Sequence, residues 1–68
     1  MSEPTFEDAQ RELEQIVERL ERGDADLDQA IGLWERGEEL YKLCVSRLDI
    51  AHGKIEELGK RIESDRPR

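Results

Sequence analysis

Apolar residues recur every three or four positions along most of the chain, which is the spacing of one face of an α-helix. The first such run lies between residues 6 and 22, and Gly23 follows it in the position where glycine commonly ends a helix. We therefore expect a first helix over about residues 6–22. Its apolar face is predicted to lie in the internal core of the fold and consists of Phe6, Leu13, Ile16, Val17 and Leu20.

A second run begins after a short connection at residues 23–26. Asp26 followed by Gln29 has the pattern of a capping box, which predicts a helix that starts near residue 27. A connection this short makes the two helices antiparallel neighbours. The start of this second helix adds three residues to the predicted internal core: Leu27, Ala30 and Ile31.

The apolar seam of the second run continues without interruption from Leu27 to Ile62, in steps of three and four. Such a seam is typical of coiled-coil packing. We expect one helix over about residues 27–58, with Gly53 and Gly59 weakening its C-terminal part. Residues 1–4 and 63–68 are expected to be disordered, around a single domain at residues 5–62. The predicted fold is all-α: an antiparallel helical hairpin with a short and a long helix, completed by self-association or by a partner.

The second helix is apolar over a wider arc than one neighbouring helix can cover. A second stripe, which includes Leu33 and Leu40, lies beside the seam, and the shorter first helix has only one face to offer. Exposed apolar surface of this extent marks an interaction site. Which face of the helix is internal and which is external stays open from the sequence. The predicted partner-binding residues are Leu33, Trp34, Gly37, Leu40, Tyr41, Leu43, Cys44 and Leu48.

Length and charge limit the possible functions. A chain of 68 residues forms at most one domain and is near the lower limit for a self-sufficient core. The net charge is −7, with −9 in residues 1–39 and +2 in residues 40–68. The acidic half would repel phosphates, so we expect no direct nucleic-acid binding. A single cysteine, no signal peptide and no apolar span of membrane length predict a cytoplasmic protein that contacts no membrane.

No group of side chains has the spacing of a catalytic or metal site. His52 is the sole histidine and follows Asp49 by three residues, whereas a metal site would need further ligands. Cys44 lies on the seam, with no histidine within one helical turn to activate its thiol. Trp34 and Tyr41 fit an internal core and an interface anchor equally well. We predict that this chain carries no catalytic residue, no metal and no cofactor.

An ordered set of segments carries a resemblance to a known family. In chain order these are Phe6-Glu7-Asp8-Ala9, residues 13–21, Gly23, residues 27–30, residues 34–37, Leu40-Tyr41, Leu43-Cys44, Arg47-Leu48 and Ala51. Over about residues 5–58 the chain resembles the small subunit of bacterial exodeoxyribonuclease VII. Trp34 stands where that family often has tyrosine, and Gly53 and Gly59 fall in its variable C-terminal part.

The resemblance implies a function that composition alone could not. The chain would be a non-catalytic subunit that docks on the long helical region of a large subunit, and the large subunit would carry DNA binding and hydrolysis. The holoenzyme of that family is a hydrolase that degrades single-stranded DNA from both ends into oligonucleotides. The free chain is expected to self-associate. The competing interpretation is a generic homo-oligomeric helical-bundle adaptor with no connection to a nuclease.

Overall fold

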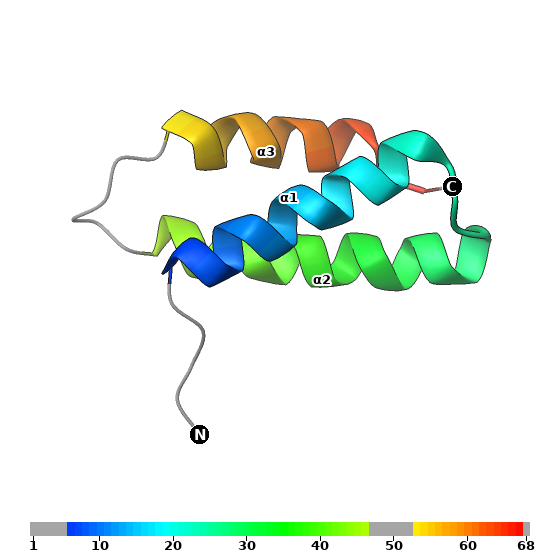
Figure 1. Ribbon diagram of the computed structural model, residues 1–68, viewed down its shortest axis with the longest axis horizontal. Helices are drawn as coiled ribbons and strands as arrows, with labels where there is room; N and C mark the ends of the chain where they lie inside the picture. The colour runs from blue at the N-terminus through cyan, green and yellow to red at the C-terminus, as the bar shows by residue number, and fades with distance from the viewer. Residues whose placement is uncertain (1–5, 47–52, 68) are drawn as a thin grey trace, which may run out of the picture.

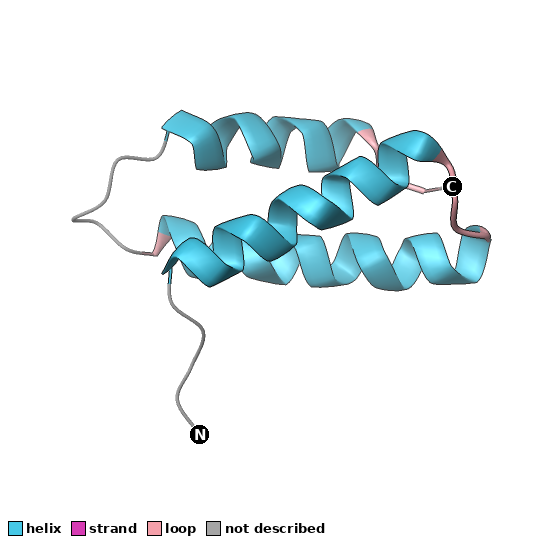
Figure 2. Ribbon diagram, in the orientation of Figure 1, coloured by secondary structure: helices cyan, strands magenta, loops and turns pink. Residues whose placement is uncertain are grey.

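The described part of the chain forms three packed α-helices. The computed structural model describes residues 6–46 and 53–67, and within them it contains α1 (Phe6–Arg22), α2 (Leu27–Val45), α3 (Gly53–Ser64) and no strand (Figure 2). The all-α prediction is confirmed, but the number of helices differs from the expected hairpin. Predictions made for residues 1–4, Leu48 and His52 lie outside the described residues.

Helix α1 has the bounds that the sequence predicted, and α2 begins at the predicted residue, because local signals set these positions. Gly23 has a φ of +71°, the left-handed conformation that ends α1, and its amide donates to the carbonyl of Leu20. The Asp26 side chain accepts from the amide of Gln29 at 2.8 Å, and the Gln29 side chain accepts in return from the amide of Asp26 at 3.4 Å. This capping box starts α2 at Leu27.

The expectation of one helix over residues 27–58 is wrong, because α2 ends at Val45. Ser46 caps α2, with its amide donating to the carbonyl of Lys42 and its hydroxyl to that of Leu43. Helix α3 runs antiparallel to α2, and α1 crosses diagonally over the pair (Figure 1). The predicted tail at 63–68 also needs correction, since residues 63 and 64 form the end of α3.

Burial of apolar surface explains why the chain reverses direction. A single straight helix would hold the side chains of α3 away from α1 and leave them in water unless another chain covered them. In the three-helix arrangement Ile55, Leu58 and Ile62 are fully buried. Complete burial of such a side chain stabilises the fold by about 1.5–3 kcal/mol. The core takes residues from all three helices: Ala9, Leu13, Ile16, Val17, Leu40, Cys44, Ile55, Leu58 and Ile62.

Gly37 lies where the three helices meet. A Cβ atom at this position would be 2.8 Å from Cδ1 of Ile62 on α3 and 3.3 Å from Cγ2 of Ile16 on α1. The sequence placed Gly37 among the predicted partner-binding residues, but two helices of the same chain approach it closely. The missing side chain therefore allows α1 and α3 to pack against α2 at one point.

Polar contacts also join the helices. The indole Nε1 of Trp34 donates to the carbonyl oxygen of Ile62 at 3.0 Å, which ties α2 to the end of α3. Carboxylates of α1 pair with cations of the other two helices, and each pair remains partly exposed and is worth at most about 1 kcal/mol. The shortest separations in these pairs are 2.9 Å for Glu12–Arg36, 3.1 Å for Glu14–Lys54 and 2.7 Å for Glu21–Arg61.

Candidate partner-binding surface

The structure divides the predicted partner-binding residues among three environments. Gly37, Leu40 and Cys44 are buried in the core, and Leu43 is 39% exposed. The side chains of intermediate exposure are Leu33, Trp34 and Tyr41. Helix α3 thus covers much of the α2 surface that the sequence left for another chain.

The predicted internal core needs one correction. Leu13, Ile16 and Val17 are buried, and Phe6, Leu20 and Ala30 are partly buried, but Leu27 is 53% exposed and Ile31 is 39% exposed. Both α1 and α3 pack on the side of α2 that carries Gly37, Leu40 and Cys44. Leu27 and Ile31 are four residues apart on a different side, so neither helix covers them.

These two side chains and three acidic residues near them form a surface that we call the outer α2 face. It consists of Leu27, Ile31, Asp28, Glu35 and Glu38. Residues three and four apart are neighbours on a helix, so Asp28 and Glu35 flank Ile31 on successive turns. Asp28 and Glu35 are exposed, whereas Glu38 is half-buried. Sequence reasoning missed this set, although the helical neighbours of Ile31 could have revealed it.

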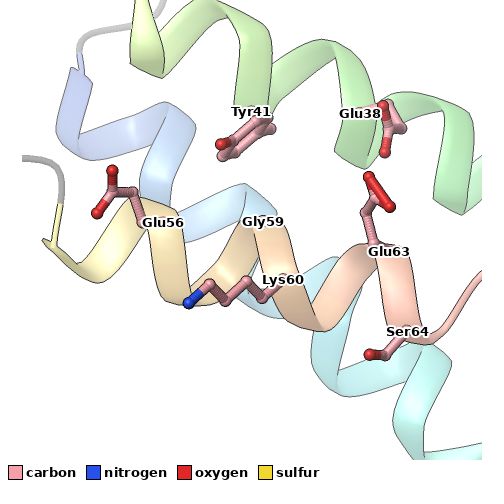
Figure 3. A pocket seen from close by; sticks show the side chains of 7 residues that line it. All are labelled: Glu38, Tyr41, Glu56, Gly59, Lys60, Glu63 and Ser64. Atoms are coloured by element: carbon pink, nitrogen blue, oxygen red, sulfur yellow. The ribbon is translucent and has the colours of Figure 1, made fainter.

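A groove between α2 and α3 lies beside the outer α2 face, and Glu38 belongs to both. The groove has a volume of about 560 Å³ and is lined by Glu38, Tyr41, Glu56, Gly59, Lys60, Glu63 and Ser64. In Figure 3, Glu38 and Glu63 point toward one another across the groove, and the Tyr41 ring lies over Gly59. Three carboxylates and one lysine give this region a negative charge.

The other side of α2 is different in character. A hollow of about 420 Å³ there is lined by Arg36, Glu39, Leu40, Lys42 and Leu43. Arg36 pairs with Glu39 as well as with Glu12 of α1, so its charge is satisfied within the chain. This side therefore combines one exposed leucine with both signs of charge.

The described residues offer little for covalent or metal chemistry. Burial raises the pKa of the Cys44 thiol, so its protonated and poorly nucleophilic form is favoured. Among residues 6–46 and 53–67, no group of three or more His, Cys, Asp or Glu side chains could hold a metal ion. No helix in this part of the chain has the length and apolarity required to cross a membrane. The features left to explain are exposed apolar side chains and unpaired carboxylates.

Comparison with known proteins supplies a family. Residues 6–57 match the family described as "Exonuclease VII small subunit". A relative from Leptospira borgpetersenii serovar Hardjo-bovis, named "Exodeoxyribonuclease 7 small subunit", is 54% identical over 59 residues, which are 87% of this chain and 62% of that protein. A relative of the same name from Rhizobium rhizogenes is 50% identical over 58 residues, 85% of this chain and 70% of its own length. No solved structure matches the chain significantly.

Proposed function

Because the chain belongs to the exonuclease VII small-subunit family, we propose that it is the non-catalytic small subunit of an exodeoxyribonuclease VII. The match over residues 6–57 carries this proposal. In the proposed complex a large subunit holds single-stranded DNA and hydrolyses it from both ends into oligonucleotides. The net charge of −7 supports this division of labour, since an acidic chain is poorly suited to hold phosphates.

The proposed role of this chain is to dock on the large subunit through side chains that its own fold leaves uncovered. Leu27, Ile31 and Leu43 are the exposed large apolar residues within the described ranges, and all three belong to α2. Covering such side chains by a partner removes apolar surface from water. In the absence of the large subunit, we propose that copies of the chain associate with each other. We also propose that the complex is located in the cytoplasm, together with its single-stranded DNA substrate.

Co-purification and nuclease assays with the large subunit from the same organism test the proposal. Tagged chain and untagged large subunit would be co-expressed, and single-stranded DNA labelled at either end would be offered to each subunit and to the complex. We expect the subunits to purify together, the complex to degrade both labelled ends, and the chain alone to be inactive with or without Mg²⁺.

Two other outcomes would overturn the proposal. Nuclease activity that follows the isolated chain through successive purification steps would show that it is catalytic. A chain that forms homo-oligomers and never retains the large subunit would instead be the generic helical adaptor.

A further inference from the structure

Two features coincide on the outer α2 face and need a common explanation. Leu27 and Ile31 are exposed there by 53% and 39%, although residues of this type are usually buried. Asp28, Glu35 and Glu38 stand around them, and none of the three forms an ion pair with any residue that the structure describes. The face is thus apolar at its centre and negatively charged at its edge.

Within the described residues, cations of α2 and α3 pair with carboxylates of α1 rather than with those of the outer α2 face. Arg36, Lys54 and Arg61 are held by carboxylates of α1, so the pairs between helices neutralise the α1 side of the molecule. Lys42 lies one turn beyond Glu38 on α2, and Lys60 lines the groove with Glu38, but within the described residues neither lysine forms an ion pair with a carboxylate of this face. The carboxylates at its edge are therefore available to pair with cations of another molecule.

We propose that the outer α2 face docks a basic amphipathic helix of the large subunit, which deepens the proposed function and rests on it. An apolar stripe on that helix covers Leu27 and Ile31, in the way that amphipathic helices dock through residues spaced by three and four. Lysine or arginine side chains beside the stripe face Asp28, Glu35 and Glu38. Glu38 also lines the groove between α2 and α3, so a long basic side chain can reach from the face toward Tyr41.

A second copy of this chain fits the face poorly. The described cations without a printed ion pair or ring contact are spread over the three helices as Arg19, Lys42 and Lys60, so a copy offers no cluster of positive charge. A two-fold symmetric contact would place the same carboxylates of both copies against one another. The net charge of −7 on each copy adds to this repulsion. Complementarity therefore favours a basic helix over a copy of the chain.

Affinity for the purified large subunit, measured by calorimetry at several NaCl concentrations, tests the proposal with two matched pairs of variants. Ile31→Ser removes apolar contact on the face, and Gln15→Ser is its control, since Gln15 is an exposed side chain of α1 away from that face. Glu35→Lys reverses a charge on the face, and Glu18→Lys makes the same change at an exposed position of α1. Circular dichroism melts of all four variants report whether the fold is retained.

We expect Ile31→Ser and Glu35→Lys each to raise the Kd at least tenfold, with both controls within about twofold of the wild type. Added salt should weaken binding by the wild type more than binding by Glu35→Lys, since that variant has lost part of the electrostatic attraction. Equal losses in each variant and its control would overturn the assignment of the face while leaving the proposed function intact.

Two further outcomes have different meanings. If Ile31→Ser dissociates oligomers of the free chain in light scattering and leaves the Kd for the large subunit unchanged, the face binds a second copy and the proposal is overturned. If the wild-type chain does not bind the large subunit at all, the proposed function and this inference both fail.

Discussion

The aromatic ring of Tyr41 on α2 lies directly over the backbone of Gly59 on α3 (Figure 3). A Cβ atom at residue 59 would be 2.8 Å from both Cδ1 and Cζ of the ring, closer than real Cβ atoms approach their neighbours. Glycine costs a helix about 1 kcal/mol relative to alanine. Its presence inside α3 is therefore explained by the close packing of α3 against α2.

Replacing Gly59 with alanine should loosen this packing. We expect Gly59→Ala to lower the free energy of unfolding by about 1–3 kcal/mol, because the added methyl group forces the ring or the helix to move. Gly32→Ala is the matched control, since a Cβ there meets no atom within 4 Å and should stabilise α2 by up to about 1 kcal/mol. Urea denaturation followed by circular dichroism measures both. A Gly59→Ala variant as stable as the wild type would show that the contact does not limit how α3 packs.

The hydrogen bond from Trp34 to Ile62 leads to a second prediction. Trp34→Phe keeps an aromatic ring but removes the Nε1–H donor, so it should cost about 0.5–1.5 kcal/mol of stability. The guanidinium of Arg66 lies 5.2 Å from the centre of the same ring, and Arg66→Gln should cost less than about 1 kcal/mol. Thermal melts at matched concentration compare the two variants. If Trp34→Phe has the same melting temperature as the wild type, the hydrogen bond to Ile62 contributes nothing to the docking of α3.

Leu40 and Leu43 offer a direct test of which side of α2 is internal. Leu40 is 1% exposed and Leu43 is 39% exposed, although they lie only three residues apart. Leu40→Ala should lower the free energy of unfolding by about 2–5 kcal/mol through lost burial and a residual cavity. Leu43→Ala should change it by less than about 1 kcal/mol. Equal losses, measured by urea denaturation, would mean that α3 does not cover Leu40 in solution.

Glu21 and Asp65 should respond to pH in opposite senses. The hydrogen bond from Arg61 lowers the pKa of Glu21, so this pairing stabilises the fold above the ordinary glutamate pKa and is lost as the pH falls through the lowered value. Burial, followed by the neighbouring Glu21 carboxylate, raises the pKa of Asp65. An ionised Asp65 therefore opposes folding at pH values above its raised pKa.

Substitutions at these two positions should change stability in opposite directions. Asp65→Asn should raise the melting temperature at pH 7, and this advantage should shrink as the pH falls through the raised pKa of Asp65. Glu21→Gln should lower the melting temperature at pH 7, with a smaller deficit in acid. The melting temperatures of both variants are measured by circular dichroism between pH 3 and pH 7, a range of about four pH units that includes the ordinary carboxyl pKa values. A less stable Asp65→Asn variant at pH 7 would contradict this account.

The sequence alone determined the features that depend on near neighbours in the chain. The capping box joins Asp26 to a residue three positions away, and Gly23 ends α1 through its own backbone conformation. The apolar face of α1, with Leu13, Ile16 and Val17, follows from helical periodicity and is buried as predicted. Such signals need no knowledge of the rest of the fold, because the groups that interact lie within one helical turn.

The tertiary structure alone decided where the second apolar run divides and which side of α2 faces inward. Steps of three and four from Leu27 to Ile62 are equally compatible with one long helix and with two helices packed against each other, because periodicity records only local spacing. Once α3 folds back, Leu40 and Cys44 become internal and Leu27 and Ile31 are left outside. The candidate surface could not be read from the sequence for this reason: a residue's exposure depends on which distant segment packs over it.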